Sequence, residues 1–130
     1  EYRKAVSDYA KIGGHMNMPP LYTLGYWYSK YQKYTQQEFM DIVNEIKSHD
    51  IPLDVMIFDM DWHDRDWTGW TWDKTVIPEP EKLIKFMHDN KLRVALNLHP
   101  ADGVDNDEEF FSDMTRDLGL PASTKNIPES

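Results

Sequence analysis

Apolar residues along the chain follow two patterns, one at helical intervals and one in short continuous runs. The first helical pattern contains Tyr2, Val6 and Tyr9, which lie three to four positions apart. Gly13 and Gly14 follow it, and glycine is the residue that most often ends a helix. The segment before these glycines is therefore predicted to form a lead-in helix.

Three more helices are predicted further along the chain. Thr35 and Glu38 have the spacing of an N-terminal capping box, and apolar residues from Phe39 to Ile46 share one helical face behind it. Pro80 suits the first turn of the next helix, because an N–H at that position would have no partner within the helix. The predicted helices cover residues 35–48, 80–90 and 110–118.

Three short apolar runs between the helices predict β-strands. The middle run is almost continuously apolar, which is typical of a strand buried on both faces of a parallel sheet. The first run is rich in aromatic residues, which favour strands. The predicted strands cover Tyr22–Trp27, Leu53–Phe58 and Arg93–Leu98.

Strands that alternate with helices predict an α/β fold with a parallel sheet and right-handed crossovers. A complete (β/α)8 barrel takes about 250 residues. We therefore interpret residues 1–130 as one unit, a lead-in helix and about the first three βα units of a partial TIM (β/α)8 barrel. A small three-layer doubly wound domain is the second choice, because residues 119–130 show no pattern of a fourth strand.

Such a partial sheet would have two open edges, which present unpaired backbone N–H and C=O groups. We expect these edges to contact the remainder of the barrel or a second copy of the chain.

The chain has 14 Lys and Arg residues against 23 Asp and Glu residues, a net charge of -9. This balance disfavours nucleic acid and anionic membranes as partners and favours a neutral ligand.

The sequence contains no cysteine and no apolar run near the roughly 20 residues that a membrane helix needs. A disulfide framework and a thiolate metal site are therefore excluded. We expect a soluble chain, and the sequence does not indicate its compartment.

Polar residues follow the ends of the three predicted strands, at Ser29–Tyr34, Asp59–Trp62 and Asn97–His99. In parallel α/β folds ligands bind at the carboxyl ends of the strands, so these segments are expected to share one face. Asp59 and Asp61 flank Met60, and in an extended backbone the two carboxylates would point the same way. The same pair is also typical of a solvated loop or a helix cap.

Asp59, Asp61 and His63 could also be considered as metal ligands, since carboxylates and imidazole at alternate positions can meet on one cation. The segment lacks the glycine that an EF-hand loop needs, and no second histidine follows at ligand spacing. We predict no metal site, and hydrogen bonding is the simpler role for these residues.

Trp62, Trp67, Trp70 and Trp72 lie within eleven residues and fit neither helical nor strand periodicity as a group. Flat aromatic faces suit the C–H faces of pyranose rings, while carboxylates and amides bind the hydroxyls. The segment therefore indicates a carbohydrate site, although we expect the core to take about half of these side chains. Trp62 is included among the candidate substrate-binding residues.

Two further residues are candidates for contact with a sugar. Tyr31 is the preferred aromatic contact beside the first strand. His99 could donate to a sugar hydroxyl or to Asp59, although a histidine at a strand end is as often structural. The remaining histidines outside the tryptophan-rich segment are assigned to the surface: His15, His49 and His88.

Several of these stretches together resemble the opening of the catalytic domain of family 31 glycoside hydrolases, the group that contains α-glucosidases and α-xylosidases. The resemblance implies that Asp59 hydrogen-bonds sugar hydroxyls in the -1 subsite, that Tyr31 helps to wall this subsite, and that Met60 lies beside it. It covers about residues 17–104 and rests on Pro19–Trp27, Ser29–Tyr31, Ile51–Trp62 and Leu96–Pro100.

The family's nucleophile is an aspartate after the fourth strand, and its acid/base aspartate comes later still. Both are expected beyond Ser130. Retaining hydrolysis needs two carboxyl groups about 5 Å apart, an arrangement that the neighbours Asp59 and Asp61 do not resemble. The resemblance thus implies a retaining α-glycosidase that needs no cofactor or metal. This chain would be a part of that enzyme and would be inactive in isolation.

Two small departures from the family pattern are Lys30, where arginine is common, and Ile77–Pro80 in place of a Phe-Pro-Asp-Pro sequence. Neither affects the expected subsite. The sugar itself stays open, and so do two alternatives. One is another barrel glycosidase, such as an α-galactosidase-like enzyme, and the other is a non-catalytic carbohydrate-binding or assembly module.

Overall fold

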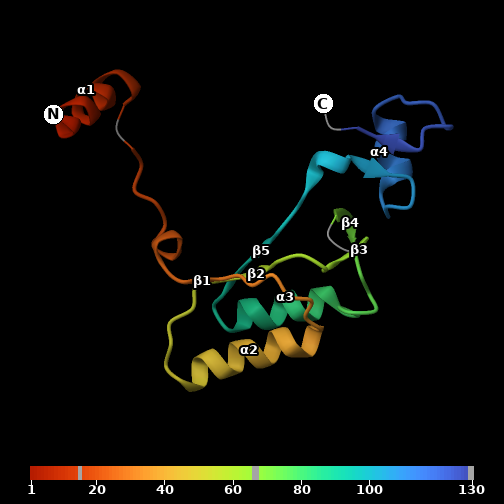
Figure 1. Cartoon of the computed structure of the whole chain (residues 1–130), viewed down its shortest axis with the longest axis horizontal. Helices are drawn as coiled ribbons and strands as arrows, with labels where there is room; N and C mark the ends of the chain where they lie inside the picture. Colours follow the sequence, from red (N-terminus) through yellow and green to blue (C-terminus); the bar gives the residue numbers. More distant parts are fainter. Residues whose placement is uncertain (15, 66–67, 129–130) are drawn as a thin grey trace.

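The computed structural model describes residues 1–14, 16–65 and 68–128 (Figure 1). His15 and Trp67 therefore lie outside the described residues. The helices and strands, in chain order, are α1 (Tyr2–Gly13), η1 (Leu21–Leu24), β1 (Trp27–Tyr28), α2 (Gln36–Ser48), β2 (Val55–Phe58), β3 (His63–Arg65), β4 (Thr68–Trp72), α3 (Pro80–Asp89), β5 (Arg93–Leu96), η2 (Pro100–Asp102), β6 (Val104–Asp105), α4 (Phe111–Asp117) and β7 (Asn126–Ile127).

The central element is a parallel sheet with the strand order β1-β2-β5. Met56 is paired with Tyr28 on one side and with Val94 on the other. Helices α2 and α3 lie side by side along this sheet (Figure 1). The predicted α/β class is confirmed, because the sheet is parallel and each crossover between its strands contains a helix.

Helix α2 begins where the sequence predicts. The Thr35 hydroxyl accepts a hydrogen bond from the Glu38 backbone N–H, and the Glu38 carboxylate accepts one from the Thr35 backbone N–H, which completes the capping box. Helix α3 has Pro80 in its first turn, as predicted. Both helices turn their apolar residues toward the sheet.

The hydrophobic core lies between the sheet and helices α2 and α3. Phe58 of β2 is fully buried, and its ring centroid lies 4.6 Å from that of Phe39 and 6.1 Å from that of Trp72. The core therefore joins strand, helix and the tryptophan-rich segment in one cluster. Its buried members are Tyr34, Phe39, Val43, Met56, Phe58, Trp62, Val76, Ile77, Leu83, Met87 and Leu92.

The first predicted strand is wrong over most of its length. Residues Leu21–Leu24 form a 3-10 turn, and strand β1 contains only Trp27 and Tyr28. The Pro20 carbonyl explains the turn, because it accepts hydrogen bonds from both the backbone N–H and the hydroxyl of Thr23. Turn formation by a proline carbonyl and a hydroxyl side chain has outweighed the β propensity of the aromatic residues.

The tryptophan-rich connection also differs from the prediction, because part of it forms an antiparallel hairpin of β3 and β4. A second unexpected pair forms near the end of the chain, where Val104 pairs with Ile127. Residues 119–130 thus contain a short strand, contrary to expectation. Within the described residues it lies outside the three-stranded parallel sheet, so it does not favour a doubly wound domain.

Helix α1 extends away from the rest of the chain (Figure 1). It has no buried residues, and Tyr2 and Tyr9 are 91% and 75% exposed. The predicted lead-in helix is present, but its apolar face packs against nothing that the structure describes. No helix within the described ranges has the length and apolar character needed to cross a membrane.

Candidate functional site

The carboxyl ends of the three parallel strands bring three polar side chains together. Asp59 directly follows β2, the central strand. Its carboxylate accepts a hydrogen bond from the Ser29 hydroxyl at 2.9 Å, after β1, and one from the Asn97 amide at 2.6 Å, after β5. The backbone N–H of Met60 adds a third, at 2.9 Å. The sheet therefore gathers these residues because adjacent parallel strands end at the same edge.

These contacts determine the electrostatics of Asp59. The hydrogen bond from Asn97 is the largest influence and lowers the pKa of the carboxyl, with smaller contributions from Ser29, Met60 and the charge of His99, while partial burial opposes the shift. The carboxylate is thus ionised at neutral pH. Because the pKa is depressed, these contacts contribute fully to the stability of the fold above the ordinary pKa of an aspartate. This contribution is lost as the pH falls through the lowered pKa.

Asp61 does not continue the strand. Strand β2 ends at Phe58, and Met60 and Asp61 form a turn in which Asp61 has the left-handed φ of 66°. The extended backbone assumed for the Asp59–Asp61 pair is therefore wrong, and strand alternation does not align the two carboxylates. A sugar contact for the half-buried Asp61 stays a prediction.

Trp62 is placed inside the protein. It is only 4% exposed, and its ring centroid lies 4.8 Å from that of Trp72. Its indole N–H donates to the backbone carbonyl of Asn97 at 2.9 Å, which fastens the turn after β2 to the end of β5. Trp70, in contrast, is 43% exposed. A sugar contact by Trp62 stays a prediction. The hydrogen bond of its indole to the Asn97 carbonyl is a structural contact.

The other candidate residues lie at different depths around the strand ends. Tyr31 is 71% exposed on the loop after β1, whereas Met60 is half-buried beside Asp59. His99 is half-buried after β5, and its carbonyl accepts a hydrogen bond from Thr68 of the hairpin. His49 and His88 lie on the surface, as predicted.

His63, considered above as a possible metal ligand, is 1% exposed and packs against Trp62 with 4.2 Å between the ring centroids. Across residues 1–14, 16–65 and 68–128, no group of three or more His, Asp or Glu side chains is arranged to hold a metal ion.

The β3–β4 hairpin is fastened to the segment that follows β5. Glu108, only 8% exposed, accepts hydrogen bonds from the Thr71 hydroxyl at 2.6 Å and from the Trp70 backbone N–H at 3.1 Å. The Trp70 indole N–H donates to the Gly103 carbonyl at 3.1 Å. The loops after the second and third parallel strands therefore form one connected wall beside the site.

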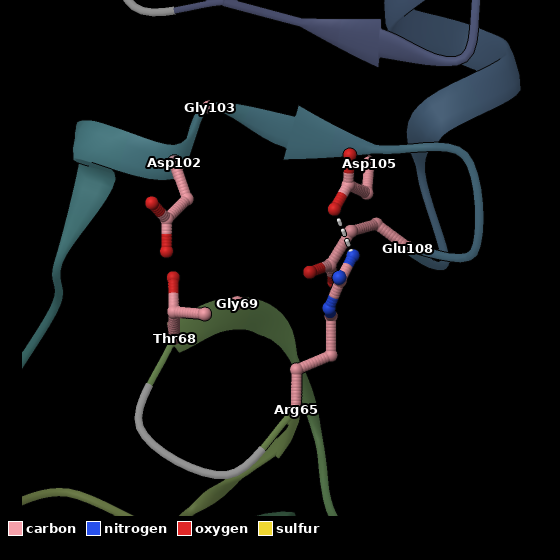
Figure 2. A pocket seen from close by; sticks show the side chains of 7 residues that line it. All are labelled: Arg65, Thr68, Gly69, Asp102, Gly103, Asp105 and Glu108. Atoms are coloured by element: carbon pink, nitrogen blue, oxygen red, sulfur yellow. Dashed lines mark hydrogen bonds and ion pairs between the residues drawn. The ribbon is translucent and has the colours of Figure 1, made fainter.

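Arg65 adds an ion pair to this connection. Its guanidinium contacts the carboxylates of Asp105 and Asp107, and Figure 2 shows it pointing from the hairpin toward Asp105. The small cavity enclosed there has a volume of about 10 Å³, room for about one water molecule. We interpret the ion pair of Arg65 as structural, because the cavity beside it is too small for a sugar.

Replacing Glu108 with alanine is expected to loosen the hairpin. The Trp70 N–H and the Thr71 hydroxyl would lose the buried carboxylate that accepts their hydrogen bonds, which costs about 1–3 kcal/mol. Hydrogen exchange at the Trp70 amide should become about tenfold faster or more. Glu109→Ala is the matched control, because Glu109 is exposed and only its backbone N–H contacts Thr71. Equal exchange rates in the two variants would contradict the role of Glu108.

Sequence reasoning included Ser29 and Asn97 in the segments at the strand ends but did not identify them as partners of Asp59. Glu108 was missed altogether. A signal for the hairpin was available, because four of the five residues of Thr68–Trp72 are threonine or tryptophan, which favour strands. The sequence offers no comparable signal for Glu108.

Comparison with known protein families gives a match over most of the chain. Residues 16–127 match the model described as "Glycosyl hydrolases family 31 TIM-barrel domain". An alpha-xylosidase of Saccharolobus solfataricus is 30% identical over 110 residues, which are 84% of this chain and 15% of that protein. Neutral alpha-glucosidase C of Mus musculus is 31% identical over 105 residues, 81% of this chain and 12% of that protein.

Solved structures of the same family share the fold. A GH31 alpha-xylosidase from a soil metagenome, complexed with xylose, superposes with a TM-score of 0.62 at 26% identity, over 78% of this chain and 14% of that one. An alpha-xylosidase from Xanthomonas citri gives a TM-score of 0.69 at 21% identity, over 96% of this chain and 15% of that one. The chain spans about a seventh of the length of these proteins.

Proposed function

Because the chain belongs to glycoside hydrolase family 31, we propose that it is a segment of a retaining α-glycosidase and that it forms part of the -1 subsite. The observation that supports this proposal is the ionised Asp59 carboxylate, held at the end of β2 by donors from β1 and β5. Its position at the carboxyl edge of a parallel sheet is where enzymes of barrel folds bind their substrates.

The chemistry of this edge suits a neutral sugar. A carboxylate accepts hydrogen bonds from sugar hydroxyls, and such charge-assisted bonds are about twice as strong as neutral ones. Tyr31 is largely exposed and Met60 half-buried near Asp59, so both are proposed to wall the ring. Asp61 and His99 are proposed as polar contacts at the margin of the site, and Trp62 as the residue that supports it.

Within this proposal, the segment recognises the substrate and other parts of the enzyme supply the reactive carboxylates. Retaining hydrolysis requires two carboxyl groups about 5–5.5 Å apart, one as nucleophile and one as acid/base. We infer that both follow Ser130 in the full-length enzyme, by which we mean the longer chain that contains this sequence. The substrate is proposed to be an α-linked glycoside, and the mechanism uses no cofactor or metal.

The remainder of the barrel is the proposed partner of the two open sheet edges. Strand β1 pairs only with β2, and β5 pairs only with β2, among the described residues. Strands of the same chain would cover these edges in a complete barrel, and a second copy would be the alternative in the isolated segment. The partial barrel and its first three βα units are thus proposed together with the function.

A comparison of activities tests this proposal. The 130-residue chain and the full-length enzyme would each be assayed with the para-nitrophenyl α-glucoside, α-xyloside, α-galactoside and α-N-acetylgalactosaminide. We expect the full-length enzyme to hydrolyse at least one of them and the segment to hydrolyse none. Turnover by the segment would refute the inferred position of the catalytic pair. Binding without turnover by the full-length enzyme would favour a carbohydrate-binding module.

A further inference from the structure

The Asp59 carboxylate is held by strands on both sides of it. Asn97 donates to Oδ1 at 2.6 Å and Ser29 donates to Oδ2 at 2.9 Å, while the Met60 N–H donates to Oδ1 at 2.9 Å. One donor follows each neighbouring strand, and the third lies in the turn after β2. The two side-chain donors therefore fix both oxygens of the carboxylate, which restricts its rotation.

The number of acceptor sites indicates which oxygen is available to a ligand. An ionised carboxylate has about four lone-pair sites, two on each oxygen. The three described donors use two on Oδ1 and one on Oδ2. The lone-pair site that these three donors leave open is therefore on Oδ2, the oxygen that accepts from the hydroxyl of the exposed Ser29.

We propose that Asn97 and Ser29 are positioning residues that hold Asp59 so that Oδ2 accepts a hydroxyl of the bound sugar. This inference rests on the proposed function and adds two residues to the site. Ordering a side chain before the ligand arrives removes part of the entropic cost of binding. The depressed pKa of Asp59, for which the Asn97 hydrogen bond is the largest cause, agrees with the geometry.

The backbone around Asn97 makes this idea testable without dismantling the sheet. The Asn97 N–H donates to the Phe58 carbonyl, and the Asn97 carbonyl accepts from the Trp62 indole. Both are backbone groups of Asn97, so a change of its side chain leaves them in place. Ser29 is exposed, so its hydroxyl can be removed with little effect on the core.

The first measurement is an NMR titration of the Asp59 side-chain carboxyl in the 130-residue chain. We expect Asn97→Ala to raise the pKa of Asp59 most and Ser29→Ala to raise it less, because each removes a donor that favours the ionised form. Ser29→Thr keeps the hydroxyl and should titrate like the unchanged chain. Asn44→Ala, on the exposed face of α2, is the matched asparagine control.

Asn97→Asp provides a sharper version of the same test. The substitution keeps the shape of the side chain but replaces the amide donor with a second carboxylate next to Asp59. Two carboxylates at hydrogen-bonding distance cannot both ionise easily, so the pair should titrate in two separated steps. An Asp59 titration that is unchanged in Asn97→Ala, Asn97→Asp and Ser29→Ala would overturn the proposal. If the Asn97 variants do not fold, Ser29→Ala against Ser29→Thr decides it.

Kinetics of the full-length enzyme then test the effect on the sugar. We expect Asn97→Ala to lower kcat/KM by about tenfold or more, because a misplaced carboxylate loses a charge-assisted hydrogen bond to the hydroxyl. Asn44→Ala should leave it unchanged. A shifted Asp59 titration with normal kcat/KM would overturn the positioning role. If the unchanged full-length enzyme hydrolyses no α-glycoside, the proposed function fails, whereas the titration still decides whether Asn97 and Ser29 hold Asp59.

Discussion

Replacing Phe58 with alanine is expected to lower the free energy of unfolding by about 3–5 kcal/mol. Phe58 is fully buried, and it contacts Phe39 of α2 on one side and Trp72 of β4 on the other. Its removal would leave a cavity where the sheet, a helix and the hairpin meet. Domains of this size have a total stability of about 5–15 kcal/mol, so the variant should be close to unfolded.

Urea unfolding, followed by tryptophan fluorescence and by circular dichroism, would measure this loss. Phe110→Ala is the matched control because Phe110 is 64% exposed at the start of α4. Its unfolding midpoint should lie near that of the unchanged chain. Equal midpoints for the two phenylalanine variants would show that the cluster around Phe58 does not stabilise the fold.

The helices of the fold were predictable because their signals are local. Thr35 and Glu38 specify the start of α2 within four residues, and Pro80 marks the start of α3 in the same way. The buried strand β2 was also predictable, since a run of apolar residues needs no information about its partners. The prediction of the first strand was wrong over most of its length because hydrogen bonds from Thr23 to the Pro20 carbonyl hold this segment in a turn.

The site was predictable only in part. The rule that ligands bind at strand ends selected the segments that the structure brings together around Asp59, including those that contain Ser29 and Asn97. Their contact with Asp59 depends on the strand register, in which Leu96 is paired with Phe58 and Asn97 is therefore level with Asp59. A single sequence does not specify that register.

The wall beside the site was beyond prediction for a similar reason. Its contacts join residues that are almost forty positions apart, such as Trp70 and Glu108. The turn at Asp61 has a different cause, since its positive φ of 66° is a conformation that aspartate tolerates better than most residues but that nothing in the sequence requires.

Replacing Asp59 with asparagine in the full-length enzyme is expected to reduce kcat/KM by about tenfold to a hundredfold. The substitution removes the charge of the acceptor proposed to bind a sugar hydroxyl. It also preserves the local geometry, because the new amide oxygen can accept from Asn97 and Met60 in place of Oδ1. The new amide N–H can donate to the Ser29 hydroxyl, which is able to accept as well as donate. Activity should therefore fall while the unfolding midpoint changes little.

Asp64→Asn is the control for this experiment. Asp64 is an exposed aspartate on β3, five residues along the chain, so its substitution removes the same charge from the same region. A loss of activity in both variants would mean that the net charge near the site matters more than the placement of one carboxylate. Normal turnover in Asp59→Asn would remove Asp59 from the proposed sugar site. A loss confined to Asp59→Asn, with both proteins folded, would distinguish recognition of the substrate at this strand end from a general electrostatic effect.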